Sequence, residues 1–132
     1  SLNEKGLRLA LEELATHIRQ VNELGIRIEW NNVNENELSG DLKLTVFRIV
    51  QEQLSNIIKH AEAKEVCISL NRREDALYLS VKDDGIGFDT TQKKNGVGLR
   101  NICSRAELNN GHACIHSAPG NGCELLVCFP AC

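Results

Sequence analysis

The sequence predicts an α+β two-layer sandwich, in which a mixed, mainly antiparallel five-stranded sheet carries about three helices on one face. Helix and strand patterns follow one another in the order α-β-α-β-β-loop-α-β-β. This irregular order argues against a doubly wound parallel sheet, in which strands and helices alternate regularly. The later strand patterns come in pairs separated by short turn sequences, and such pairs form antiparallel hairpins.

Three segments have the apolar spacing of amphipathic helices. In residues 5–24 apolar side chains recur every three or four positions until Gly25, and a glycine in this place commonly ends a helix. A longer helix is expected over about 41–62. A third is expected over about 98–109, where Asn-Asn-Gly provides the stop signal.

Five segments have the pattern of short strands. They are residues 26–31, 65–72, 76–83, 112–117 and 123–129. A charged turn joins the second to the third, and the sequence Pro-Gly-Asn-Gly joins the last two. The polar stretch 32–40 and the Gly- and Lys-rich stretch 84–98 have no periodicity, so both are expected to be loops.

The length and composition suit one domain, residues 1–132, with a core of its own, since 42% of the residues are hydrophobic and 25% are charged. The net charge of −3 and the lack of a basic tract make nucleic acid a poor candidate partner. No apolar run approaches the roughly 18 residues that cross a bilayer, so we expect no direct membrane contact. Nothing resembles a signal peptide.

The six cysteines raise the question of a disulfide framework or a zinc site. They are Cys67, Cys103, Cys114, Cys123, Cys128 and Cys132. None forms a C-x-x-C pair, and the histidines do not supply a zinc-finger spacing. We therefore favour reduced, partly buried thiols in a cytosolic protein over both alternatives.

The long helix carries a polar stripe opposite its apolar side. The apolar side consists of Phe47, Val50, Leu54, Ile57, Ile58 and Ala61. At about 100° per residue, Glu52, Asn56, Lys59 and His60 share the other side. Such a stripe is in most helices simply a solvated face. Here, however, Asn and Glu oxygens suit Mg²⁺, while Lys and His suit phosphate.

The strand over 76–83 ends in a carboxylate that shares the face of its apolar residues. By the two-residue period, Asp83 points to the same side as Leu79 and Val81. A buried carboxylate is costly unless it has a partner. Asp83 therefore either caps the following turn or accepts a hydrogen bond from a ligand amine, such as that of adenine.

Two pairs of glycines follow this strand. Gly85 and Gly87 permit a positive φ and close approach of the backbone to a ligand, although D-x-G-x-G also occurs in calcium loops and plain turns. Gly96 and Gly98 precede a helix, whose N-terminal amides form a natural phosphate site. The spacing fits neither the dinucleotide fingerprint nor a Walker A loop.

Taken together and in this order, E-x-x-x-N-x-x-K-H, D-x-G-x-G and G-x-G-L resemble the N, G1 and G2 boxes of the GHKL ATPase superfamily. That superfamily includes histidine kinases, gyrase-type topoisomerases, mismatch-repair ATPases and heat-shock chaperones, and the resemblance implies its Bergerat ATP-binding fold. Residues 48–63 and 96–111 are similar to sensor histidine kinases of the nitrate-sensor and lipid-desaturase-sensor type. The short lid between Gly87 and Gly96 fits the same group.

The resemblance implies the ATP-binding catalytic domain of a two-component sensor histidine kinase, with ATP and Mg²⁺ as ligands. Such a domain transfers the γ-phosphoryl group of ATP to a histidine, chiefly by positioning and charge stabilisation. Its partners would be the phosphoacceptor helix of the parent kinase and, indirectly, a response regulator. The domain would be cytoplasmic, whether or not the parent is anchored in the membrane.

The resemblance also assigns roles to single residues. Asn56 matches the Mg²⁺ ligand, and Glu52 matches the acid that orients or activates the attacking group and is a second candidate ligand. Lys59 and His60 match positions near the phosphates, and we count Lys59 with Glu52 and Asn56 as catalytic. Asp83 matches the acid that binds adenine N6. The remaining nucleotide-binding positions are Gly85, Gly87, Lys93, Lys94, Gly96, Val97, Gly98, Leu99 and Cys123.

Three of these positions need comment. Lys93 and Lys94 lie in the lid, where they are either solvated loop charges or groups that close over the phosphates. Cys123 stands where the family usually has a threonine, and a thiol is a weaker hydrogen-bond partner than a hydroxyl.

The chain reads as a fragment, because it has no methionine and begins inside a helix pattern. Residues 1–24 look like the linker that follows the dimerisation helices in this group. None of His17, His60, His112 and His116 has the sequence context of a phosphoacceptor. We therefore expect the chain to bind ATP without phosphorylating itself.

Two alternatives remain open at this point. An anti-sigma-factor serine kinase of the same superfamily has a similar length, and dimerisation helices upstream in the parent gene would exclude it. A non-enzymatic module with a degenerate site would not gain stability from Mg²⁺ and an ATP analogue, whereas a site bound at saturation would.

Overall fold

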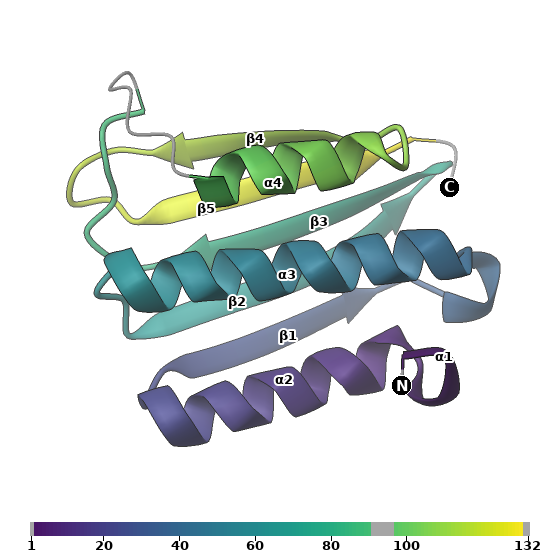
Figure 1. Ribbon diagram of the computed structural model, residues 1–132, viewed down its shortest axis with the longest axis horizontal. Helices are drawn as coiled ribbons and strands as arrows, with labels where there is room; N and C mark the ends of the chain where they lie inside the picture. Colours follow the sequence, from purple (N-terminus) through teal and green to yellow (C-terminus); the bar gives the residue numbers. More distant parts are fainter. Residues whose placement is uncertain (1, 91–96, 131–132) are drawn as a thin grey trace.

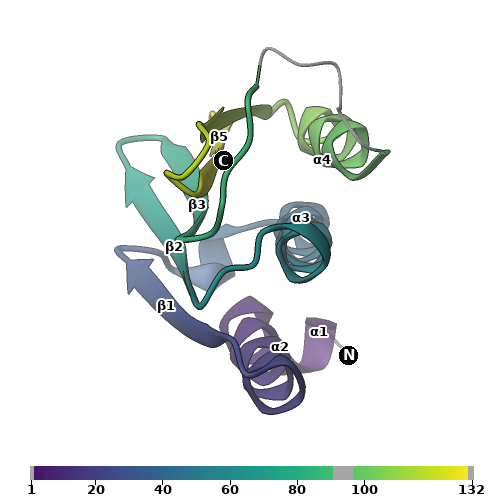
Figure 2. The same cartoon turned by 90° about the vertical axis from the view of Figure 1, so that its left-hand side faces the viewer.

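A five-stranded sheet forms one layer of the structure, and three helices form the other (Figures 1 and 2). The computed structural model describes residues 2–90 and 97–130. The strands are β1 (Gly25–Asn31), β2 (Glu65–Arg73), β3 (Ala76–Asp83), β4 (His112–Ser117) and β5 (Cys123–Phe129), in the order β1-β2-β3-β5-β4. Only β1 and β2 pair in parallel. The predicted α+β class, with a mixed and mainly antiparallel sheet, is confirmed.

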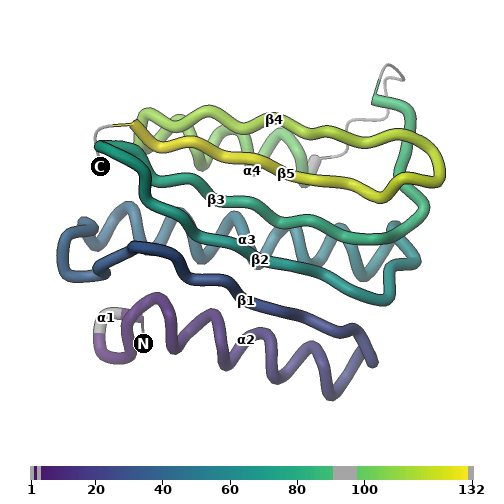
Figure 3. Tube along the Cα trace, turned by 180° about the vertical axis from the view of Figure 1, so that it is seen from behind, coloured from purple at the N-terminus to yellow at the C-terminus, as the bar shows by residue number. Residues whose placement is uncertain are grey.

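The helices α2 (Leu7–Asn22), α3 (Gly40–His60) and α4 (Val97–Glu107) lie side by side on one face of the sheet. The other helical elements of the described residues are a short helix α1 (Leu2–Lys5) and a 3₁₀ turn η1 (Glu35–Glu37). Among the described elements, none covers the other face, which Figure 3 shows from behind. The core therefore lies between the helical layer and the inward face of the sheet.

The hydrophobic core is built from alternate residues of the central strands and one side of each helix. Leu77, Leu79 and Val81 of β3 are fully buried, and the residues between them are more exposed, as the two-residue period predicts. On the helical side, Leu11 and Val46 are buried against this face. Burial of aliphatic side chains at this interface supplies most of the stability of such a sandwich.

The predicted helix over 5–24 is interrupted near its start. Gly6 has a φ of +84°, and α2 begins at the next residue. The carboxylate of Glu35 accepts hydrogen bonds from the amides of Leu7 and Arg8. Glu35 thereby satisfies two amides that a helix N-terminus leaves without a partner. This cap comes from 28 residues away in the sequence, so local spacing could not reveal it.

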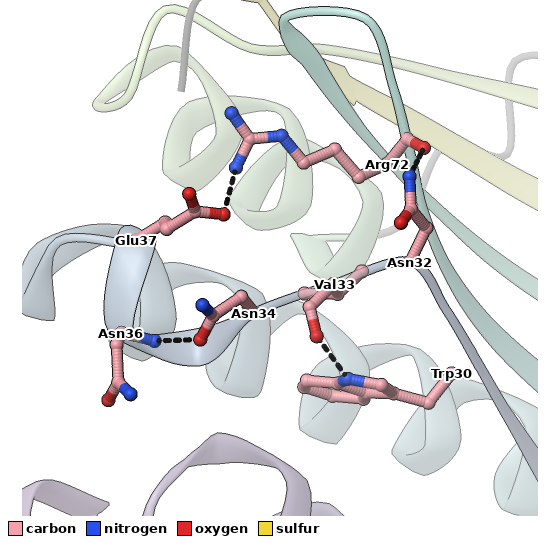
Figure 4. A network of polar contacts seen from close by, with 7 residues as sticks. All are labelled: Trp30, Asn32, Val33, Asn34, Asn36, Glu37 and Arg72. Atoms are coloured by element: carbon pink, nitrogen blue, oxygen red, sulfur yellow. Dashed lines mark hydrogen bonds and ion pairs between the residues drawn. The ribbon is translucent and has the colours of Figure 1, made fainter.

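The loop between β1 and α3 is fixed by polar contacts (Figure 4). The indole nitrogen of Trp30 donates to the carbonyl of Val33 at 2.8 Å. Arg72 forms an ion pair with Glu37 at 3.2 Å, which ties η1 to the end of β2. The loop predicted for 32–40 is thus correct except for the single turn of η1 and for Gly40, which already belongs to α3.

Helices α3 and α4 pack antiparallel, and polar residues join them at both ends (Figure 1). Near one end, Asn109 Nδ2 donates to the Thr45 hydroxyl at 2.6 Å. Near the other, Gly98 lies against the side chain of Asn56. Asn109 lies just past the last residue of α4, so one contact joins the helices near each end of their shared length.

Two observations bear on the function classes considered above. No helix in the described ranges is long and apolar enough to span a membrane. The five described cysteines are all free of disulfide bonds.

We expect Leu79→Ala to lower the free energy of unfolding by about 2–5 kcal/mol, because it leaves a cavity in a fully buried position. The control is Leu108→Ala, at a side chain that is 78% exposed, where the change should stay within about 0.5 kcal/mol. Urea unfolding followed by circular dichroism measures both. Equal losses in the two variants would contradict this placement of the core.

Candidate functional site

The elements that carry Asn56, Asp83 and Gly98 come together at one end of the sandwich, on the left in Figure 1. There β3 and α3 end, while α4 and β5 begin. The contacts that join them involve glycines: Gly85 lies against Ala61 at the end of α3, and Gly98 lies against Asn56. Gly122 lies against Asp83. Three parts of the chain that are distant in sequence thereby form one site.

Asp83 is the most strongly constrained polar residue of this site. Asp83 is only 4% exposed and lies at the end of the apolar row of β3. Oδ1 accepts a hydrogen bond from the amide of Gly85 at 2.8 Å. Oδ2 is buried and has no hydrogen-bond partner among the described residues. One oxygen therefore caps the turn, while the other is available to a donor on a ligand.

Burial raises the pKa of the Asp83 carboxyl above its usual range, against an opposing effect of the Gly85 hydrogen bond, and the nearby charge of Asp84 raises it slightly further. Burial disfavours the charged form of an acid because the low-dielectric surroundings solvate it poorly. A hydrogen-bond donor from a ligand would stabilise this carboxylate, so the site favours ligands that carry an amine or amide group.

The neighbouring residue Asp84 has a structural role. Its Oδ1 accepts hydrogen bonds from the amides of Lys64 and Glu65, at 2.8 and 3.0 Å. These bonds lower the pKa of Asp84. In addition, the amide of Ile86 donates to the carbonyl of Ala61 at 2.8 Å. The loop after β3 is thus held against the start of β2 and the end of α3.

The glycines of this loop are needed for two different reasons. Gly87 has a φ of +65°, as the sequence suggested, and a Cβ there would also lie 2.1 Å from the Ala118 carbonyl oxygen. Gly85 is not among the residues with positive φ. A Cβ at Gly85 would instead lie 2.2 Å from the Ala61 carbonyl oxygen. Close approach of two backbone segments, rather than backbone conformation, requires glycine at position 85.

Gly122 was not singled out from the sequence as a site residue. It has a φ of +69°, and a Cβ there would lie 2.2 Å from the carbonyl oxygen of Asp83. Its own carbonyl accepts a hydrogen bond from the Ser117 hydroxyl at 2.7 Å. The Ser117 hydroxyl also accepts from the amide of Phe88 at 3.0 Å. The turn before β5 thereby shapes the floor of the site, and only its Pro-Gly-Asn-Gly sequence hinted at this.

Cys123 lies directly opposite Asp83 in the pairing of β3 with β5. It is buried. Burial, and then the charge of Asp83, raise the pKa of its thiol to about 11. The thiol is therefore protonated at neutral pH and serves as a small apolar wall beside the carboxylate.

The polar stripe of α3 divides into two parts. Asn56 is half-buried beside Gly98 of α4, and Glu52 is also half-buried. Lys59 and His60 are exposed in the last turn of the helix. The structure thus brings Asn56 toward the N-terminus of α4 and leaves the Lys59 and His60 side chains exposed to solvent.

Several positions of α3 differ from the predicted apolar side, which also left out the buried residues Leu42, Thr45, Val46 and Ile49. Ile58, expected to face the core, is 41% exposed. Gln53, which the apolar pattern omitted, is 4% exposed. The reason is that α3 lies between α2 and α4 as well as on the sheet, so its buried arc is displaced toward α4.

Several predicted residues cannot be placed. Lys93, Lys94 and Gly96 lie outside the described residues. Val97 opens α4, and Leu99 in its first turn is half-buried. The lid part of the predicted site is therefore still a prediction.

The oxygen donors of α3 are compatible with a hard divalent cation. Within residues 2–90 and 97–130, no group of three or more His, Cys, Asp or Glu side chains is arranged to hold a metal ion. Asn56 and Glu52, one turn apart on α3, offer a carboxamide and a carboxylate oxygen. Mg²⁺ commonly takes only one or two protein oxygens, with substrate phosphates and water completing its shell.

Comparison with known families gives a match over most of the chain. Residues 40–132 match the family described as histidine kinase-, DNA gyrase B-, and HSP90-like ATPase. The matched range contains Asn56, Asp83 and Gly98.

Three similar curated proteins are histidine kinases by name. An uncharacterized sensor-like histidine kinase of Chloroflexus aurantiacus is 31% identical over 98% of this chain. Sensor histidine kinase LiaS of Bacillus subtilis is 35% identical over 98%, and the histidine-protein kinase/phosphatase DegS of Brevibacillus brevis is 31% identical over 80%. The matches cover 23%, 36% and 28% of these relatives, so the chain spans about a quarter to a third of their length.

Solved structures with the same fold are also histidine kinases. The histidine kinase domain of a blue-light activated kinase from Erythrobacter litoralis EL346 has a TM-score of 0.72 and 18% identity, covering 95% of this chain and 65% of that one. The kinase AdeS of Acinetobacter baumannii has a TM-score of 0.75 and 13% identity, covering 96% of this chain and 64% of that one. At these identities the likeness establishes the fold.

We expect Asp83→Asn to become more stable relative to wild type as the pH rises. The folded state raises the pKa of this carboxyl, so wild-type stability falls as the pH increases from about 4, the pKa of a free Asp, through the folded pKa. The amide does not titrate and escapes this loss. Thermal unfolding of both proteins between acid and neutral pH measures the difference, and a difference independent of pH would show that Asp83 is not buried as described.

Proposed function

We propose that this domain transfers the γ-phosphoryl group of ATP to a histidine on another part of its parent protein. The chain belongs to the histidine kinase-, DNA gyrase B- and HSP90-like ATPase family, and it is an ATP-binding domain of the sensor histidine kinase type. The observation that carries the proposal is Asp83 Oδ2, a buried acceptor without a partner among the described residues. A planar base with an exocyclic amine supplies the missing donor.

The adenine site that we propose is formed mainly by backbone segments around Asp83. Gly85 and Gly122 let neighbouring segments approach Asp83 more closely than any side chain would permit. Cys123 supplies an apolar wall next to it. In this pocket Asp83 accepts a hydrogen bond from adenine N6, which fixes the orientation of the ring and directs the phosphates toward α3 and α4.

The phosphate end of the site would be formed by α3 and the N-terminus of α4. Asn56 Oδ1 and the Glu52 carboxylate are the groups that would hold Mg²⁺, which when bound neutralises charge on the phosphates. The amides at the start of α4 lie beside Asn56 and favour anions, since a helix N-terminus carries partial positive charge. Lys59 and His60, exposed in the last turn of α3, would contact the phosphates from the solvent side. Glu52 would orient the attacking imidazole.

The partner of this reaction would be a helix that carries the phosphoacceptor histidine. The matches cover only 23% to 36% of these relatives, which leaves room for such a helix in a parent protein of similar length. We propose that residues 1–24 connect to it, that a response regulator receives the phosphoryl group, and that the domain lies in the cytoplasm where ATP is available.

The anti-sigma-factor serine kinase gains no support, because these similar curated proteins are named as histidine kinases rather than serine kinases. The degenerate binding module is also disfavoured, because the described part of the site retains the buried acid, the half-buried Asn56 and the glycine contacts.

We expect Asp83→Asn to abolish nucleotide binding, because its one acceptor oxygen is taken by the Gly85 amide and its NH₂ group is left facing the adenine N6 donor. Wild type at a ligand concentration 100 times Kd should gain about 2.7 kcal/mol of stability, and Asp83→Asn should gain none. Thermal unfolding with ADP or a non-hydrolysable ATP analogue measures this gain. The matched control is Asp41→Asn, an exposed acid in the first turn of α3, at the other end of that helix. Wild-type affinity in Asp83→Asn would show that the pocket is misplaced.

We expect Asn56→Asp to weaken Mg²⁺-dependent binding of the ATP analogue while sparing ADP binding in EDTA. The added charge changes the cation site and repels phosphates, but it is remote from the adenine contact. Isothermal titration with and without Mg²⁺ separates the two effects. Loss of both affinities to the same degree would mean that Asn56 does not act at the phosphate end.

A further inference from the structure

Gln53 is a buried carboxamide on α3 to which no role has been assigned. It lies between buried aliphatic residues on the core side of the helix and is 4% exposed. The buried polar residues of the described chain are Thr45, Gln53 and Asp83. Thr45 is bonded to Asn109, and Asp83 belongs to the nucleotide pocket. Since burying a carboxamide costs free energy unless it is bonded, the contacts of Gln53 bear on its role.

The hydrogen-bond partner of Gln53 is Asn56, one turn further along α3. Asn56 Nδ2 donates to Gln53 Oε1 at 3.5 Å. On its other side, the Asn56 carboxamide faces Gly98, where an added Cβ would lie 2.7 Å from Oδ1 and 2.9 Å from Nδ2. The carboxamide is therefore confined between a side chain of its own helix and the backbone of α4, so that its rotation is limited.

The two ends of this carboxamide differ chemically. The oxygen is an acceptor, whereas the NH₂ group only donates, and a cation can be bound only through the oxygen. We infer that Gln53 is a positioning residue that engages the NH₂ end of Asn56 and so turns Oδ1 toward Mg²⁺ and the phosphates. This inference rests on the proposed function and deepens it.

The effect of Gln53 should be confined to one part of the ligand. Groups that orient a metal ligand through a hydrogen bond typically change metal affinity by about 10- to 100-fold when removed. The adenine contact at Asp83 does not involve Gln53. Loss of Gln53 should therefore weaken the Mg²⁺-dependent part of nucleotide binding and leave the binding of ADP in EDTA unchanged.

The test compares three variants of the chain. Gln53→Met keeps the length of the side chain and removes the acceptor. Gln53→Glu keeps an acceptor oxygen for Asn56 Nδ2. The matched control, Gln51→Met, makes the same chemical change at an exposed position of the same helix.

The measurements are titrations with ADP in EDTA and with a non-hydrolysable ATP analogue at increasing Mg²⁺. We expect Gln53→Met to need at least about tenfold more Mg²⁺ than wild type to reach the same affinity for the ATP analogue, while its affinity for ADP in EDTA is unchanged. Gln53→Glu should retain most of the Mg²⁺ dependence, and Gln51→Met should match wild type. In an Asn56→Ala background, Gln53→Met should have no further effect.

Three results would overturn the inference. They are a Gln53→Met variant with wild-type Mg²⁺ dependence, one that loses ADP and Mg²⁺-dependent binding equally, and full additivity with Asn56→Ala. If Gln53→Met does not fold, as judged by circular dichroism, the Mg²⁺ dependence of Gln53→Glu decides, and a loss in that variant counts against the inference. Failure of the wild-type chain to bind either nucleotide would instead overturn the proposed function itself.

Discussion

A carboxylate at the end of a row of aliphatic side chains constrains this structure more than any other group. Asp83 is buried with one oxygen bonded to Gly85 and the other without a partner among the described residues. Such an arrangement costs free energy in the absence of a ligand. The fully buried core of β3, with Leu77 and Val81, contributes enough stability to tolerate it. Sites that bind ligands commonly retain a local cost of this kind, and the protein around them offsets it.

The surroundings of Asp83 are consequences of that burial. Gly85 lies against the Asp83 carboxylate and Gly122 lies against the Asp83 backbone carbonyl, at distances that leave no room for a side chain. Asp84 contributes by a separate set of hydrogen bonds, which hold the loop to the start of β2. Two neighbouring aspartates thus have opposite pKa shifts, because one is buried without sufficient donors and the other is exposed and accepts two amides. Only the first is suited to a ligand.

The position of the phosphate end depends on the packing of α4 against α3. The Thr45–Asn109 hydrogen bond near one end of the pair and the close contact of Gly98 with Asn56 near the other keep the helices in register. The positively polarised N-terminus of α4 is thereby placed beside the polar side chains of α3. A cation and phosphates bound there would complete a contact that the two helices already begin, and Gln53 would set the orientation of the carboxamide between them.

Local patterns predicted the strands well, and they placed Asp83 at the end of a buried row. The hairpin strands 112–117 and 123–129 have the predicted bounds, because turn sequences and two-residue alternation are properties of neighbouring residues. The same alternation placed Asp83 on the buried face. Contacts between distant segments were beyond such patterns: the Glu35 cap of α2, the role of close approach at Gly85, and the burial of Gln53 in place of Ile58. The periodicity of a helix shows which residues share one side of it. Which side of α3 is buried depends on the packing of α4, a segment some 40 residues away in the sequence, so the local pattern could not decide it.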